Sequence, residues 1–168
     1  MVPNPELLVA DFVAAIKETY SRSLNSTMIA HHFVHAPHTP PDLPAGKCGV
    51  YVFSLTSTAT ARAGPNRALK VGRIGMNSGP RFKYQHYKSG SANSTVAGSL
   101  ENNSLLWTYL GVPRGVPDLG DWLKRSTDRD HFLVDGTNED LVPLLEVYLK
   151  AVLGPVLEGS LKNHAAIP

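Results

Sequence analysis

The sequence has little cysteine and no long apolar run. A single cysteine, Cys48, among 168 residues excludes an internal disulfide and any zinc module built from several cysteines. No apolar segment is long enough to cross a bilayer, and the N-terminus lacks the basic and then apolar composition of a signal peptide, so we expect a cytoplasmic protein. With 42% hydrophobic and 18% charged residues, the chain has the composition of one compact globular domain.

Carboxylates are absent from the middle of the chain. Residues 43–100 contain no Asp or Glu, although the whole chain has 14 acidic residues. The same stretch contains eight basic residues: Lys47, Arg62, Arg67, Lys70, Arg73, Arg81, Lys83 and Lys88. The formal net charge of +2 therefore conceals a local positive field that would attract a polyanion, although a solvated basic face without a partner explains the charges equally well.

The first 46 residues are predicted to form a helix and an arm. Apolar residues recur at every fourth position from Leu8 to Tyr20, after Pro5 at a helix start. Histidines one helical turn apart can share a zinc ion, but prolines interrupt the histidine-rich segment that follows. Without a helix to fix their spacing, we favour a polar, partly extended arm over a metal site. The histidines are His31, His32, His35 and His38.

Two apolar stretches further along the chain predict an antiparallel pair of strands. They cover residues 49–56 and 68–75, and a loop of small residues joins them. Further strands are expected over 105–110 and, as a short one, over 131–134.

Helices are predicted on either side of these later strands. Pro80 opens a short helix, and an apolar stripe over 141–153 marks the last one. Residues 89–104 are expected to form a mobile loop, and residues 111–128 an irregular excursion or a short helix. We therefore expect an α+β fold, an α/β sandwich with about three antiparallel or mixed strands flanked by helices.

Four short motifs occur in an order that resembles the GIY-YIG nuclease superfamily. Gly49-Val50-Tyr51 stands at the place of the first family motif, and Lys70-Val71-Gly72 at the place of the second, on the paired strand. Arg81, near the start of a helix, is similar to the family arginine. Glu146 is similar to the metal-binding glutamate, and Pro155 follows it at the expected place.

The resemblance covers about residues 48–160, and the overall format resembles that of the compact restriction endonucleases of the superfamily. Two positions depart from the family pattern, because Lys70 replaces a tyrosine and Glu158 replaces the closing asparagine. The implied organisation has three parts: an N-terminal arm over 1–46, a GIY-YIG-like domain with insertions over 47–160, and a tail over 161–168.

The resemblance implies Mg²⁺-dependent, site-specific cleavage of DNA, with Mn²⁺ as a substitute ion. Glu146 would bind the ion, whose shell is completed by waters and phosphate oxygens. Arg81 would clamp the phosphate with its forked guanidinium. Tyr51 would orient or deprotonate the attacking water. Lys70 would contact a phosphate oxygen or a nearby water, and its charge would lower the pKa of the tyrosine.

Other residues near these motifs are given supporting roles. His86 is a rival general base with an ordinary pKa closer to neutrality, although helical counting places it off the face of Arg81. Arg73, Lys83 and Lys88 flank the site and are expected to contact backbone phosphates.

Three other functions remain open at this stage. One is a catalytically idle nucleic-acid-binding module on the same fold, because Lys70 and Glu158 depart from the family pattern. The second is a nuclease selective for RNA or for a nucleic-acid structure, and the third is a protein without a nucleic-acid partner. Cleavage of both strands of DNA would need either a homodimer or two successive nicks.

Overall fold

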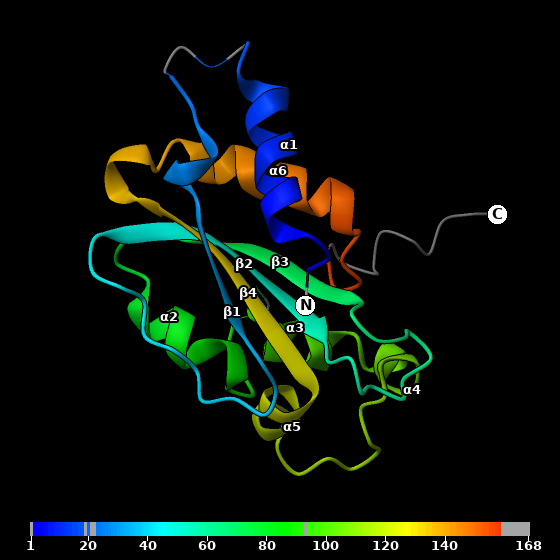
Figure 1. Ribbon diagram of the computed structural model, residues 1–168. Coiled ribbons are helices and arrows are strands. Elements are labelled where there is room, and N and C mark those ends of the chain that lie inside the picture. Colours follow the sequence, from blue (N-terminus) through cyan, green and yellow to red (C-terminus); the bar gives the residue numbers. More distant parts are fainter. Residues whose placement is uncertain (1, 19, 21–22, 93, 159–168) are drawn as a thin grey trace, which may run out of the picture.

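The computed structural model describes residues 2–18, 20, 23–92 and 94–158. Its centre is an open, four-stranded antiparallel sheet (Figure 1). The strands are β1 (Ala30–Val34), β2 (Lys47–Leu55), β3 (Ala68–Ile74) and β4 (Thr127–Asp135). They lie in the order β1-β4-β2-β3, so β1 and β3 are the edge strands.

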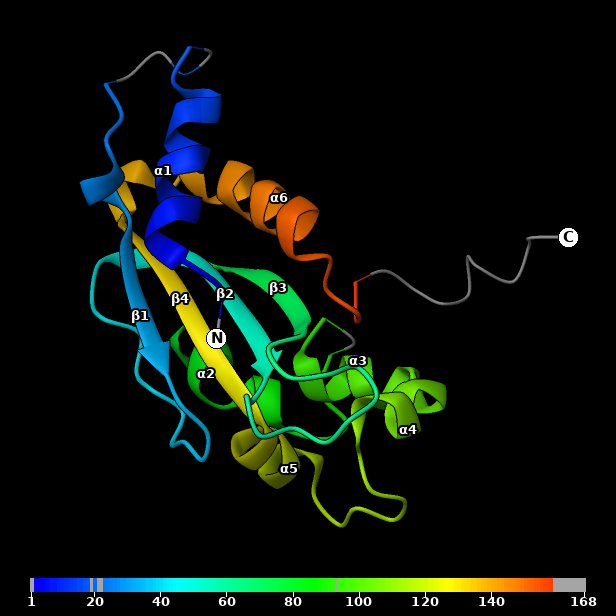
Figure 2. The same ribbon diagram turned by 45° about the vertical axis from the view of Figure 1, so that its right-hand side comes forward.

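Helices cover both faces of the sheet. Helices α1 and α6 lie over one face, and α2, α3 and α5 lie over the other (Figure 2). The α-helices of the described residues are α1 (Pro5–Ile16), α2 (Gly79–Lys83), α3 (Val96–Asn102), α4 (Trp107–Leu110), α5 (Leu119–Ser126) and α6 (Leu141–Leu153). Short 3₁₀ turns separate several of them: η1 (Ser26–Met28), η2 (Gln85–Tyr87), η3 (Ser104–Leu106) and η4 (Gly136–Asn138).

Strand β2 is the centre of the core, because both of its faces are covered. Val50 and Val52 pack in the layer of α1 and α6, whereas Tyr51 and Phe53 pack in the layer of α2, α3 and α5. This two-sided burial explains its nearly continuous apolar sequence. The expected α+β class and the antiparallel pairing of β2 with β3 are confirmed.

The expected number of three strands is wrong, because β1 and a long β4 complete the sheet. Strand β1 lies inside the segment expected to be an arm and pairs with β4 along its whole length. The short strand expected at 131–134 is nine residues long, because it also includes Asp128, Arg129 and Asp130, which are buried. Such charges are typical of loops, and only their partners in the folded chain allow them to lie in a strand.

The strand expected over 105–110 is also wrong, since η3 and α4 occupy it. Its apolar residues do not form a buried face: Leu105 is 90% exposed, whereas Leu110 is buried. Gly111 ends α4 in the left-handed conformation, with φ of 77°.

Two segments expected to be irregular contain capped helices. Helix α3 lies within the expected loop 89–104, and the side chain of Thr95 accepts a hydrogen bond from the Gly98 amide at its start. Helix α5 confirms the short-helix alternative for 111–128, with Asp118 as its cap. The expected tail over 161–168 lies outside the described residues. None of the helices within the described ranges is long and apolar enough to cross a membrane.

Candidate active site

A cavity of about 370 Å³ opens at the outer edge of β3, and we call it the β3-edge cavity. It receives side chains from both layers of helices, since Arg81 comes from α2 and Glu146 and Lys150 come from α6. Four of the five expected catalytic residues line it, and Arg73 joins them. The charged and phenolic side chains of the cavity are Tyr51, Lys70, Arg73, Arg81, Glu146, Lys150 and Glu158.

Tyr51 and Gly72 form a cross-strand pair between β2 and β3. A Cβ atom at Gly72 would overlap the hydroxyl group of Tyr51, so the glycine provides the space that the phenol occupies. The two residues come from the two expected motifs, so the second motif leaves the space that the tyrosine of the first one fills. The tyrosine is directed to the edge of the sheet by this pair.

The phenol of Tyr51 is almost completely buried, with 1% of the residue exposed. Burial raises the pKa of Tyr51 above its ordinary value, and the nearby Arg81 guanidinium opposes this rise without cancelling it. The expectation that Lys70 in particular lowers this pKa is wrong. Lys70 instead donates a hydrogen bond to the Ser99 hydroxyl in α3, and partial burial lowers its own pKa.

Arg81 is positioned by the segment that precedes α3. Its Nη2 donates to Ser94 Oγ at 2.8 Å and to the Ser94 carbonyl at 3.3 Å. Its Nε has no hydrogen-bond partner among the described residues. The guanidinium is thus fixed at one end and retains donor capacity for an anion.

Glu146 belongs to a chain of charges that connects α6 to the edge of β3. Its Oε2 lies 2.8 Å from Arg73 Nε, and its Oε1 lies 3.0 Å from Lys150 Nζ. Lys150 Nζ also lies 2.9 Å from Glu158 Oε2, and Glu158 Oε1 accepts a hydrogen bond from the Val71 amide at 3.2 Å. Although burial disfavours its charge, the hydrogen bonds to both glutamates raise the pKa of Lys150.

The donor set of the cavity suits only a partly hydrated metal ion. Within the described ranges, no three His, Cys, Asp or Glu side chains form a metal-binding group. Mg²⁺ can bind through one carboxylate, keeping several waters and taking phosphate oxygens from a substrate. Glu146 fits that role if Arg73 or Lys150 gives up its contact with one oxygen of the Glu146 carboxylate.

His86 lies behind the cavity and does not line it. The residue is fully buried, and its ring centroid lies 4.4 Å from that of Tyr51 and 5.5 Å from that of Phe53. Burial lowers the pKa of His86 well below its ordinary value, so the ring is neutral at pH 7. The structure therefore places this rival base as a packing partner of the tyrosine.

The three expected phosphate contacts do not form one group. Arg73 lines the β3-edge cavity and pairs with Glu146. Lys83 and Lys88 line a different cavity, where Lys83 Nζ lies 2.7 Å from Asp42.

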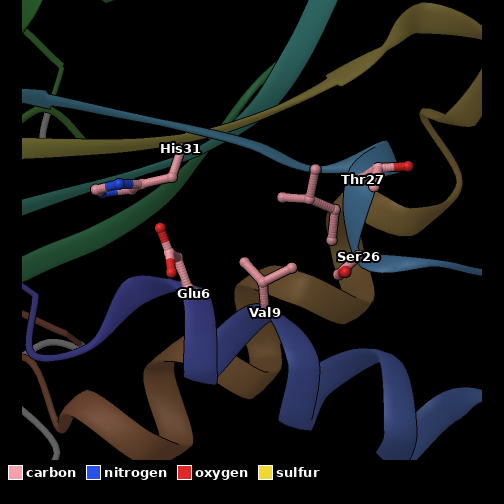
Figure 3. A pocket seen from close by; sticks show the side chains of 6 residues that line it. Glu6, Val9, Ser26, Thr27 and His31 are labelled. Atoms are coloured by element: carbon pink, nitrogen blue, oxygen red, sulfur yellow. The ribbon is translucent and has the colours of Figure 1, made fainter.

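Another cavity, of about 410 Å³, lies between α1, η1 and β1, and we call it the β1-edge cavity (Figure 3). His31 Nε2 lies 2.8 Å from the buried Asp130 Oδ1. Figure 3 shows Ser26 and Thr27 on the opposite side of the cavity from His31. The two hydroxyl side chains that line this cavity, Ser26 and Thr27, therefore do not lie beside the histidine as a nucleophile would.

The four histidines considered for zinc are separated by the fold. His31 and His32 are consecutive in β1, so their side chains point to opposite faces of the sheet. His38 lies on the side of α2 and η2, with its Nε2 2.7 Å from the Tyr87 hydroxyl. The zinc alternative receives no geometric support from these positions.

Sequence reasoning missed Lys150 and the contact made by Glu158. Lys150 follows Glu146 by four residues in a helix, and this spacing is a signal that could have identified the pair. No local sequence pattern indicates the hydrogen bond from the Val71 amide to Glu158, since 87 positions separate the two residues. No family model, curated protein or solved structure matches this chain.

Proposed function

We propose that this protein is a divalent-metal-dependent endonuclease that hydrolyses phosphodiester bonds of DNA. The observation that carries the proposal is the meeting of four side chains from β2, β3, α2 and α6 in the β3-edge cavity. They are Tyr51, Lys70, Arg81 and Glu146, the residues to which the GIY-YIG resemblance assigns catalysis. The order of motifs in a sequence does not by itself require this meeting.

The topology gives further support to the resemblance. The two motif strands form one hairpin, and α2 follows it and carries Arg81 to the cavity. Strand β4 then pairs with β2 on the side away from β3, and α6 returns Glu146 to the open edge.

The charges of the cavity suit a phosphodiester. Arg81 would bind the phosphate through donors not used by Ser94. Tyr51 is protonated at neutral pH, because burial raises its pKa, and its hydroxyl would orient the attacking water by a hydrogen bond. A Mg²⁺ ion at Glu146 would supply positive charge against the charge that develops on the phosphate oxygens.

Cleavage of supercoiled plasmid DNA in Mg²⁺ tests the proposal. Glu146→Gln and Arg81→Ala are each expected to lower the cleavage rate by at least about 100-fold, because each removes charge stabilisation. Glu139→Gln, at an exposed glutamate outside the cavity, is the matched control and should cleave normally. Undiminished cleavage by Glu146→Gln would contradict the site.

The same assay gives the specificity. Sequencing of the cut ends distinguishes a restriction-type enzyme, with discrete ends, from a non-specific one with scattered ends. Competition by duplex DNA, single-stranded DNA and RNA separates the DNA endonuclease from an RNA-selective or structure-selective one.

A catalytically idle DNA-binding module is the second candidate. It is favoured by one observation: Arg73 and Lys150 already contact both oxygens of Glu146. This candidate requires salt-sensitive DNA binding and no cleavage in either Mg²⁺ or Mn²⁺.

A further inference from the structure

Helix α2 and η2 separate the β3-edge cavity from a smaller cavity of about 270 Å³, which we call the Tyr84 cavity. Two tyrosines, a proline, a threonine and three lysines line it: Tyr84, Tyr87, Pro40, Thr39, Lys83, Lys88 and Lys124. Proteins that bind single-stranded nucleic acids combine aromatic side chains, on which the bases stack, with basic side chains that contact the backbone.

The two tyrosines differ in exposure. Tyr87 is buried and fixed, since its hydroxyl lies 2.7 Å from His38 Nε2 and 2.9 Å from Arg129 Nη1. Tyr84, at the end of α2, is 61% exposed, and Lys83 Nζ lies 5.3 Å from its ring centroid. One ring therefore forms a rigid wall, and the other presents an aromatic face to solvent.

Positive charge exceeds negative charge around this cavity. Lys83 pairs with Asp42, and Lys124 pairs with Asp121, whereas Lys88 is exposed and forms no ion pair with any described residue. Arg129 lies behind Tyr87, is fully buried, and has no carboxylate partner in the described part of the chain. The cavity therefore suits a ligand that is both planar and anionic.

We propose that the Tyr84 cavity binds an unpaired nucleotide, with its base stacked on Tyr84 and its phosphate near Lys88. Arg81 and Tyr84 are three residues apart, about 5 Å along a helix axis, and the proposal places one nucleic-acid strand across both cavities. This part of the inference rests on the proposed function, because it assumes that the same strand is bound in the β3-edge cavity. Bases within an intact duplex are stacked on each other, so the cavity favours a single strand or an overhang over a blunt duplex.

Fluorescence anisotropy in EDTA tests the inference with a labelled oligothymidylate and a labelled blunt duplex. Tyr84→Ala is expected to weaken binding of the oligothymidylate about tenfold and binding of the duplex less than about twofold, because stacking on one ring is lost. Tyr84→Phe retains the ring and should bind as the wild type does. Tyr109→Ala, at another exposed tyrosine, is the matched control and should also bind normally.

Lys88→Ala supplies an independent measurement. It should reduce the slope of log affinity against log salt concentration by about 0.7 for the oligothymidylate, since one phosphate contact is lost. Thermal unfolding of each variant confirms that these exposed substitutions leave the fold intact.

The outcomes separate this inference from the proposed function. Binding is measured without a divalent ion, so a protein that never cleaves still tests the cavity. Equal oligothymidylate binding by Tyr84→Ala and the wild type overturns the inference even if plasmid cleavage occurs. An equal loss of affinity for the oligothymidylate and the duplex overturns it as well. Selective loss for the oligothymidylate without any plasmid cleavage supports the inference and contradicts the endonuclease.

Discussion

The β1-edge and β3-edge cavities are similar in volume, about 410 and 370 Å³, and differ in charge. Glu6 and His31 are the titratable groups that line the first, and His31 is already paired with Asp130. The second gathers four basic side chains and two glutamates: Lys70, Arg73, Arg81, Lys150, Glu146 and Glu158. Volume therefore does not distinguish these cavities, whereas the arrangement of charges does.

The side chains of β4 alternate between the two faces of the sheet, so the two layers also differ in their buried charges. Asp130 faces the layer of α1, where it accepts a hydrogen bond from the Val2 amide at 2.8 Å. Arg129 faces the opposite layer, where it lies 4.8 Å from the Phe53 ring centroid and 4.6 Å from that of Phe82. The buried positive charge therefore lies on the same side as the phenol of Tyr51.

Gly72→Ala is expected to lower activity strongly, although it changes no catalytic side chain. The new methyl group must displace the Tyr51 phenol, and a displacement of about 1 Å in a catalytic group costs about 100-fold in rate. Single-turnover cleavage measures this loss. Gly79→Ala is the matched control, because a Cβ atom there meets no atom within 4 Å. Normal cleavage by Gly72→Ala would contradict a catalytic role for Tyr51.

Acidification is expected to lower the free energy of unfolding, through buried histidines on the side of the sheet that contains the Tyr51 phenol. Burial lowers the pKa of His86 and His131 well below the ordinary value, and burial lowers that of His38 to about 4. These histidines are neutral when folded and take up protons when unfolded, so the stability that they contribute is present above about pH 6.5 and is lost as the pH falls below it.

Urea denaturation at pH 7.5 and pH 5.5 measures this loss, which we expect to be about 1 kcal/mol for each of the three histidines. His86→Leu should reduce the pH dependence. His35→Gln, at a histidine whose side chain is 78% exposed, is the comparison variant. A free energy of unfolding that is equal at the two pH values would contradict the burial of neutral histidines.

Asp130→Ala is expected to affect stability and not catalysis. It leaves the Val2 amide and His31 without their buried acceptor, at a cost of about 2 kcal/mol in the free energy of unfolding. The cleavage rate of the folded fraction should equal that of the wild type. A loss of cleavage without a loss of stability would place chemistry at the β1 edge.

Lys150→Met is expected to have the smallest effect. It removes one of the two cations that contact Glu146, so the Mg²⁺ concentration for half-maximal cleavage should fall about threefold. Lys47→Met removes a comparable ion pair with Asp135 outside the cavity and should leave that concentration unchanged. An increase in the required Mg²⁺ concentration for Lys150→Met would contradict competition between the lysine and the ion.

The local parts of this structure could be predicted, and the parts that depend on distant partners could not. The β2–β3 hairpin and α6 follow from apolar patterns within a few residues. Strand β1 and the charged half of β4 depend on pairs such as His31 with Asp130. The direction of the Tyr51 pKa shift was predicted wrongly for the same reason, because counting cations along the chain does not reveal burial.

Paramagnetic broadening by Mn²⁺ in ¹H–¹⁵N spectra of the protein bound to a DNA oligonucleotide tests the central claim most directly. The account predicts that substoichiometric Mn²⁺ first broadens the amide signals of Gly72, Arg73 and Glu146, and that Glu146→Gln abolishes this effect. Broadening centred on Glu6 and His31, or no selective broadening at all, would contradict the assignment of the β3-edge cavity as the metal-dependent active site.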